Sequence, residues 1–155
     1  MLISKKMQQK LNEQINAEQF SSHLYLAMAG AFEDMNLKIF AKFFYKQAQE
    51  ETTHAMKIWQ YVLDTGGKVQ VEAIGKPEAK WDSVENTIKD ARDHELQVTG
   101  LINNLVALAE EEKDYATRGF LNWFVEEQVE EVSSMEEILA LVKMAGPNQI
   151  LNLEH

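Results

Sequence analysis

Apolar side chains recur every three or four residues along four long stretches of the chain, which is the spacing of helices that bury one face. The predicted helices span residues 4–32, 37–64, 82–112 and 114–144. Residues 65–80 lack this spacing, and their glycines and proline predict a long loop: Gly66, Gly67, Gly75 and Pro77. Because only this connection can cross the whole bundle, helices two and three are expected to run parallel. The sequence therefore predicts an all-α four-helix bundle.

The predicted helix ends carry residues that favour starting or stopping a helix. Asp82 and Glu85 have the spacing of a capping box for the third helix, and Asp114 is placed to cap the fourth. Gly146, followed by Pro147, is a natural stop for the fourth helix.

Each predicted helix has one seam of core-facing positions. The four seams are Leu11, Ile15, Glu18, Ser22, Tyr25, Ala29 and Phe32; Phe40, Phe44, Gln47, Glu51, His54, Ile58 and Tyr61; Ile88, Ala91, Glu95, Val98, Ile102, Leu105 and Ala109; and Leu121, Phe124, Gln128, Glu131, Met135, Ile138 and Val142. Polar side chains interrupt every seam roughly 20 Å from the start of its helix. Positions near mid-height meet at one level in either helix direction, so six residues are predicted to converge: Glu18, Glu51, His54, Glu95, Gln128 and Glu131.

The two helix pairs look like a faded internal duplication. A shift of 77 residues, the interval from Glu18 to Glu95, superposes three pairs of polar residues: Glu18 on Glu95, Glu51 on Gln128, and His54 on Glu131. The polar cluster would then surround a pseudo-twofold axis.

Four carboxylates buried at one level need positive charge, because each is costly to bury alone and they repel one another. The seams carry no Lys or Arg at that height, whereas two divalent cations would balance the charge. Glu51 and His54 lie three residues apart on one helix face and can share one ion. Oxygen-rich, nitrogen-poor coordination suits iron or manganese better than copper or structural zinc. A lone Glu-x-x-His or core glutamate is weak evidence, so the prediction depends on the coincidence of all six residues.

The composition narrows the classes of function. The 155 residues suit one domain, and an apolar content of 45% supplies its core. Cysteine is absent, which excludes disulfides and thiolate-bound metal. A net charge of −10 argues against nucleic acid as a partner and favours cations. There is no apolar run of membrane-spanning length and no secretory signal, so we expect a cytoplasmic protein with no membrane contact.

At these residues, and over nearly its full length, the chain resembles the ferritin family. Ferritin-like di-iron bundles use a glutamate from each of two helices and Glu-x-x-His from the other two. The stretches that carry the resemblance are NAEQF at 16–20, QEETTHA at 49–55, EEEKD at 110–114 and WFVEEQVEE at 123–131. The resemblance implies a ferritin-like bundle with a long crossover loop between helices two and three.

Departures from that template indicate a non-haem ferritin. The fourth helix carries Gln128-x-x-Glu131 in place of Glu-x-x-His, which separates the chain from bacterioferritins. Thr52 stands where bacterioferritins place a haem-binding methionine, so no haem is expected. Rubrerythrins carry a cysteine-rich iron domain, and the DNA-protecting mini-ferritins build their site between subunits.

The function implied by the resemblance is that of an iron-storage subunit with ferroxidase activity. Such a subunit oxidises Fe(II) to Fe(III) with oxygen at a di-iron centre and stores ferric mineral in a cage. The first iron would be bound by Glu18, Glu51 and His54. The second would be bound by Glu95 and Glu131, with Glu51 as the bridge and Gln128 at or near the ion.

The resemblance also implies a third, weaker iron site that shares Glu131. Its other ligands would be Glu50, Glu127 and Glu130, for which a solvated acidic face is the alternative reading. Tyr25 would lie beside the irons and supply an electron, or else be a core tyrosine with a bonded hydroxyl. Trp123 is expected to pack beside this region. His23 and His94 are expected at the surface.

For assembly, the resemblance implies a homo-oligomer, a 24-mer cage with acidic pores for iron. Relatives usually continue past Pro147 into a fifth helix, for which the remaining residues are too few. This shorter end would alter the stability, the pores or the form of the cage. Leu153-Glu154-His155 also matches the start of an appended tag, so we assign the domain to residues 1–152.

Two other functions stay open on this evidence. The same bundle serves other di-iron enzymes, such as oxygenases and manganese/iron oxidases, but these need a substrate pocket where the seams here carry large apolar side chains. A non-catalytic helical assembly protein would use the carboxylates for structural metal or leave them empty. An organic product after exposure to oxygen would favour the first, and unchanged oxygen consumption on adding Fe(II) the second.

Overall fold

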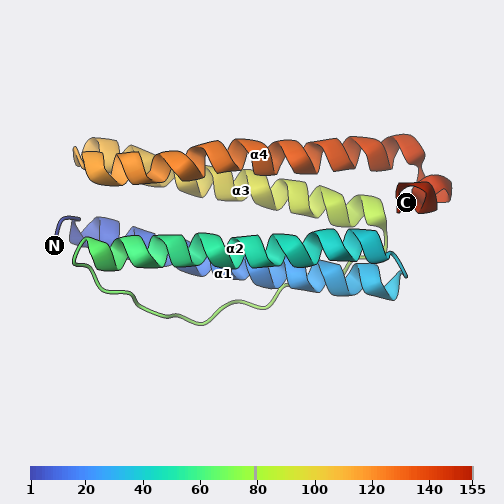
Figure 1. The fold of residues 1–155 in the computed structure, drawn as a ribbon, viewed down its shortest axis with the longest axis horizontal. Helices are drawn as coiled ribbons and strands as arrows, with labels where there is room; N and C mark the ends of the chain where they lie inside the picture. The colour runs from blue at the N-terminus through green and yellow to red at the C-terminus, as the bar shows by residue number, and fades with distance from the viewer. Residues whose placement is uncertain (79, 155) are drawn as a thin grey trace.

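Four long helices lie side by side along the long axis of the molecule in a computed structural model that describes residues 1–78 and 80–154 (Figure 1). They are α1 (Lys5–Asp34), α2 (Lys38–Asp64), α3 (Val84–Glu111) and α4 (Tyr115–Ala145). The short helices η1 (Pro147–Gln149) and α5 (Ile150–Leu153) follow at one end. Within the described residues, no helix has the length and apolar character needed to cross a membrane. The predicted all-α four-helix fold is confirmed.

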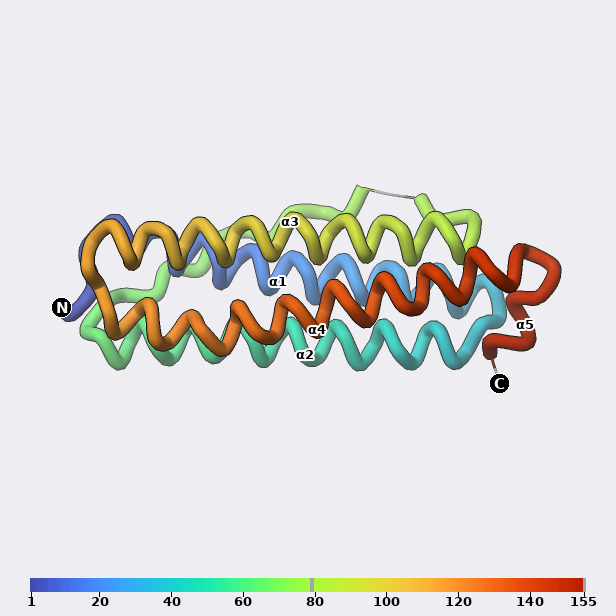
Figure 2. Tube along the Cα trace, turned by 90° about the horizontal axis from the view of Figure 1, so that it is seen from above, coloured from blue at the N-terminus to red at the C-terminus, as the bar shows by residue number. Residues whose placement is uncertain are grey.

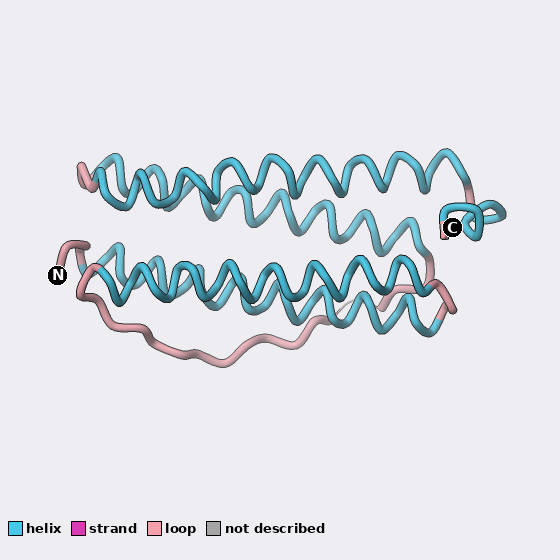
Figure 3. Tube along the Cα trace, in the orientation of Figure 1, coloured by secondary structure: helices cyan, strands magenta, loops and turns pink. Residues whose placement is uncertain are grey.

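The crossover loop sets the directions of the helices. It leaves α2 at one end of the bundle and reaches α3 at the other, so α2 and α3 run parallel, as predicted (Figures 2 and 3). Polar side chains of α1 hold the loop against the bundle. Asn12 Nδ2 donates to the carbonyl of Lys68 at 2.9 Å, and Asn12 Oδ1 accepts from the backbone N–H of Gln70 at 2.8 Å.

Side chains with oxygen atoms cap the N-termini of α3 and α4. The cap of α3 is a different residue from the one predicted. Asp114 caps α4 as expected, because its carboxylate accepts from Thr117 N at 3.0 Å and Thr117 Oγ1 at 2.6 Å. The prediction for the third helix is wrong by one position. Ser83 is its cap, with Oγ accepting from Asn86 N at 3.2 Å, while Asp82 is exposed. The extended backbone of Ser83 lets its short side chain reach that amide.

The core consists of two apolar clusters separated by a polar layer. In every helix the cluster residues stop before the predicted polar positions and resume after them: Ile15 and Leu24 in α1, Ala48 and Ala55 in α2, Ala91 and Val98 in α3, and Phe124 and Met135 in α4. The predicted seam residues are all buried except Tyr61 and Ile138, which are half-buried. The apolar clusters therefore fix the height at which the polar side chains meet.

The C-terminal segment folds back onto the start of α2. Leu37, the residue before α2, supplies no side-chain cap. The carboxylate of Glu154 takes that role, accepting from the backbone N–H of Ile39 and, at 3.0 Å, from that of Phe40. The assignment of residues 153–155 to a tag stays a prediction, and His155 lies outside the described residues.

We expect Ser83→Ala to destabilise the protein more than Asp82→Ala. Loss of a serine cap costs about 1 kcal/mol, which corresponds to a fall in Tm of roughly 2–4 °C for a chain of this size. Asp82 makes only a weaker contribution through the helix dipole. Thermal unfolding of the metal-free variants measures the difference, and a larger loss in Asp82→Ala would contradict the assignment of the cap.

Candidate metal centre

The six polar residues predicted to converge do so in the layer between the two apolar clusters. Each is buried, with at most 4% of its surface exposed. α1 supplies Glu18, α2 supplies Glu51 and His54, α3 supplies Glu95, and α4 supplies Gln128 and Glu131. Because side chains three or four residues apart share a helix face, the two residues of α2 and the two of α4 point into the same space.

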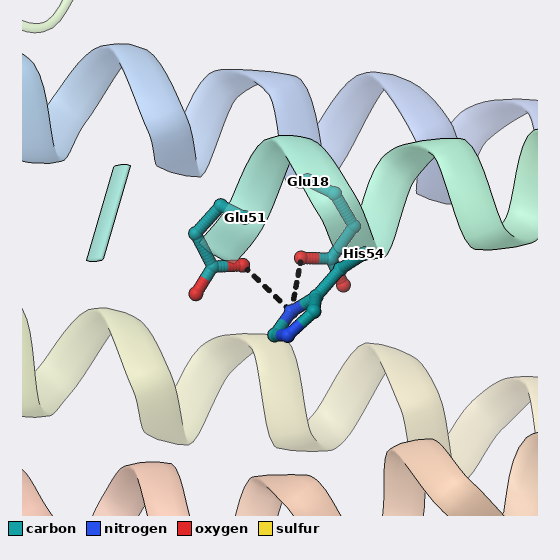
Figure 4. A group of neighbouring side chains, drawn as sticks. All are labelled: Glu18, Glu51 and His54. Carbon is teal, nitrogen blue, oxygen red and sulfur yellow. Dashed lines mark ion pairs between the residues drawn. The ribbon is translucent and has the colours of Figure 1, made fainter. Parts of the chain in front are cut away.

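Glu18, Glu51 and His54 form the first group of possible metal ligands (Figure 4). Nδ1 of His54 lies 3.2 Å from Oε2 of Glu51 and 3.9 Å from Oε2 of Glu18. Each residue offers a ligand atom within 4.8 Å of the others. A single cation placed among these atoms would be in reach of all three.

A second group shares Glu51 with the first. Glu51, Glu95 and Glu131 offer oxygen atoms that lie within 4.8 Å of one another. Since Glu51 belongs to both groups, its carboxylate could be shared by two cations. The two groups together contain the five ionisable residues proposed for the di-iron centre.

Several atoms of the cluster have no hydrogen-bond partner although they are buried. They are Oε2 of Glu18, Oε1 of Glu51, Oε2 of Glu131 and Nδ1 of His54. In the described part of the chain, the ion pairs made by Lys and Arg involve none of these carboxylates. Buried polar atoms without a partner are rare in folded proteins. Their gathering at one point fits a site built for cations.

The pKa values of the carboxyl groups in the cluster are shifted in different directions. Burial raises the pKa of Glu51 well above its usual range, and the proximity and charge of Glu18 add to this. Burial and the charge of Glu95 raise the pKa of Glu131 to about 8. For Glu18 burial opposes ionisation, but the nearby polar groups of His54, Glu51 and Gln14 outweigh it and lower the pKa. Without metal, protons therefore relieve the repulsion at Glu51 and Glu131.

The imidazole of His54 is held in an acidic, partly aromatic pocket. Burial lowers its pKa, but the proximity and charge of Glu18 outweigh this effect and raise it. The ring of Trp123 packs edge-on against the ring of His54, with 5.3 Å between their centres. Nζ of Lys57 lies 3.6 Å from the ring centre of Trp123. Trp123 thus packs beside the centre, as the sequence indicated.

Glu95 is held by two donors. The hydroxyl of Tyr25 donates to Oε1 of Glu95, and Nε2 of Gln128 donates to Oε2 at 3.1 Å. Gln128 Nε2 also donates to Oγ1 of Thr99 at 3.1 Å. Gln128 thus presents its nitrogen to Glu95, and the role of its oxygen as a ligand stays a prediction. Burial raises the pKa of Tyr25 well above its usual range, so the hydroxyl keeps its proton.

The three glutamates predicted for a further iron site are only partly brought together. Glu127 groups with His54 and Glu131, with ligand atoms within 4.8 Å. Glu50 is half-buried and its charge contributes to the raised pKa of Glu131. Glu130 is exposed. The third site stays a prediction, with Glu127 as its best-placed member.

Two residues near the centre were misjudged or missed from the sequence. The prediction that His94 lies at the surface is wrong. Its side chain is half-buried, Nε2 lies 2.7 Å from Oγ of Ser21, and the ring packs edge-on against Tyr25. Gln14 was missed, although it lies one helical turn before Glu18, and its Nε2 donates to Oε1 of Glu18 at 3.2 Å. His23 is exposed, as expected.

A four-helix bundle with a crossover loop and a buried layer of glutamates and histidine defines a ferritin-like metal-binding bundle. The ferritin-like domain matches residues 8–145 of the chain. The chain belongs to the ferritin family, as an iron-storage ferritin of the non-haem type. It is 42% identical over 135 residues to a bacterial non-heme ferritin of Staphylococcus aureus, and the aligned segment covers 87% of this chain and 81% of that protein. A bacterial non-heme ferritin of Staphylococcus haemolyticus is 42% identical over 145 residues, and the aligned segment covers 94% of this chain and 87% of that protein.

Solved structures show the same fold. An open pore ferritin from the archaeon Archaeoglobus fulgidus superposes with a TM-score of 0.97 at 42% identity, covering 99% of this chain and 94% of that one. A ferritin of Chlorobium tepidum superposes with a TM-score of 0.90 at 38% identity, and the superposition covers 92% of this chain and 87% of that one. The predicted family and fold are therefore confirmed.

We expect the metal-free protein to lose thermal stability as the pH rises from about 5 to 8. The pKa of Glu131 is raised from 4.5 to about 8, so over this range the folded state keeps a proton that the unfolded chain releases. Unfolding is then favoured by rising pH. Glu131→Gln should reduce the fall in Tm, measured by calorimetry in the presence of a chelator. Glu137→Gln, at an exposed site on α4, should follow the wild type. Equal slopes in all three proteins would contradict the raised pKa.

Proposed function

We propose that this chain is a ferroxidase subunit that binds two Fe(II) ions in the buried layer and oxidises them with oxygen. The observation that supports this most is the set of partnerless oxygen and nitrogen atoms from Glu18, Glu51, His54 and Glu131 at one point of the core. Such atoms can be satisfied together by cations. Oxygen-rich coordination suits iron.

In this proposal the first Fe(II) binds Glu18, Glu51 and His54. The second binds Glu95 and Glu131, with Glu51 as the bridge, and Gln128 holds Glu95 in place. Sites with two metals generally hold them about 3.5–4 Å apart. The two overlapping groups of ligands support a pair of ions rather than two separate sites.

The protein assists oxidation by exchanging protons for metal charge. When Fe(II) binds, it displaces the protons that the raised pKa values of Glu51 and Glu131 keep in the site. The ionised carboxylates then stabilise the greater charge of Fe(III). Each iron would lose one electron, and the two electrons together would reduce one molecule of oxygen to hydrogen peroxide, which takes up two protons. Burial excludes bulk water, which strengthens these electrostatic effects.

Tyr25 is proposed to serve the same site. Its hydroxyl donates to Glu95, so the ring could give an electron to the oxygen that is being reduced while the phenolic proton passes to that carboxylate. Its alternative role, as a core tyrosine with a bonded hydroxyl, accounts for the same contact. The further iron site from Glu50, Glu127 and Glu130 with Glu131 belongs to the proposal through the proximity of Glu127 alone.

We also propose that the chain assembles into a homo-oligomeric cage, a 24-mer, in the cytoplasm. The support is its similarity to ferritins, among them one described as having an open pore. The native mass from light scattering should be that of 24 chains. A monomer or dimer under the same conditions would contradict the cage.

We expect Glu18→Ala/His54→Ala to abolish rapid iron oxidation. Removing two ligands of the first iron should slow oxidation by more than the roughly 10–100-fold that loss of a supporting group costs. Stopped-flow absorbance measures ferric product after metal-free protein is mixed with two Fe(II) per chain in aerated buffer. Glu137→Ala is the matched control, since it removes an exposed carboxylate from α4.

Equal slow oxidation in the wild type and the double variant would contradict the ferroxidase proposal. A helical assembly protein with structural metal would give that result together with tight metal binding. An organic product formed with consumption of oxygen would instead favour a different di-iron enzyme.

A further inference from the structure

The two oxygens of Glu18 face different neighbours. Oε2 lies 3.9 Å from Nδ1 of His54 and has no hydrogen-bond partner. Oε1 accepts a hydrogen bond from Nε2 of Gln14 at 3.2 Å. Gln14 lies four residues earlier on α1 and is 3% exposed. One oxygen is therefore held by the protein while the other faces the ligands of the first iron.

We propose that Gln14 is a positioning residue for the first iron, holding one oxygen of Glu18 so that the other points into the site. This inference rests on the proposed function of the centre. The link spans one helical turn, so the backbone of α1 fixes the distance between donor and carboxylate. The amide must present its nitrogen, because its oxygen would repel Oε1.

Glu95, the residue that the 77-residue shift relates to Glu18, also accepts a hydrogen bond from an amide, although its other oxygen accepts from Tyr25. Nε2 of Gln128 donates to Oε2 of Glu95 at 3.1 Å. The shift places Gln14 on Ala91, not on a second donor. The two amide donors are thus not equivalent positions of a duplication. An amide donor therefore stands beside both carboxylates although the 77-residue shift does not relate the two donors.

An amide suits this role better than other side chains. A lysine would bring a charge that competes with the cation for the carboxylate. The amide is neutral, and its hydrogen bond to an ionised oxygen is stronger than a bond between neutral groups. The Gln14 amide therefore orients Glu18 before metal arrives.

The test is an anaerobic titration of the full-length protein with Co(II), followed by visible absorbance. Gln14→Met keeps the length of the side chain and removes the donor. Gln47→Met is the matched control, because Gln47 is a buried glutamine on α2 one turn before Glu51. Loss of a group that supports a metal ligand typically weakens binding by about 10–100-fold. We expect Gln14→Met to weaken the binding of the first equivalent of Co(II) by about tenfold. The affinity for the second equivalent should stay within about twofold of the wild-type value.

Gln14→Leu removes the donor with a different side-chain shape and should weaken binding of the first Co(II) to a similar extent. Wild-type affinity for both equivalents in Gln14→Met would overturn the proposal. So would an equal loss at both sites, or the same loss in Gln47→Met, since these mark a general effect on packing. Failure of the wild type to bind two Co(II) would instead count against the proposed di-iron centre, which keeps the two outcomes distinct.

Discussion

The mutual repulsion of four carboxylates buried at one level is the constraint on which the rest of the structure depends. Glu18, Glu51, Glu95 and Glu131 meet where the described Lys and Arg side chains form no ion pair with them. Without metal, shared protons and His54 limit the repulsion, as the raised pKa values of Glu51 and Glu131 show. Cation binding relieves this repulsion, so the exchange of protons for cations is favourable at such a site. The proposed chemistry follows from that exchange.

The scaffold makes such a costly layer tolerable by confining it. Apolar clusters above and below pack all four helices together, so the polar layer occupies only the middle of each seam. Amide and hydroxyl groups then complete the layer: Gln14 at Glu18, and Gln128 and Tyr25 at Glu95.

The sequence predicted features that depend on periodicity better than those that depend on local geometry. Seam positions and the level at which six polar residues meet follow from helix spacing alone, and the structure agrees. The cap of α3 fell on Ser83 because the choice between neighbouring oxygen-bearing residues depends on backbone angles. His94 was misplaced because Phe20 and Tyr25 of α1 cover a position that lies off the seam. Gln14 was overlooked because its role depends on where an amide points, which spacing does not determine.

The most direct test of the central claim is anomalous diffraction from crystals of the protein soaked anaerobically in Fe(II). The account predicts two iron peaks about 3.5–4 Å apart, one bound by Glu18 and His54, the other by Glu95 and Glu131, with Glu51 between them. Absence of iron from the layer at saturating Fe(II), or a single ion outside it, would contradict the claim that these carboxylates form a di-iron centre.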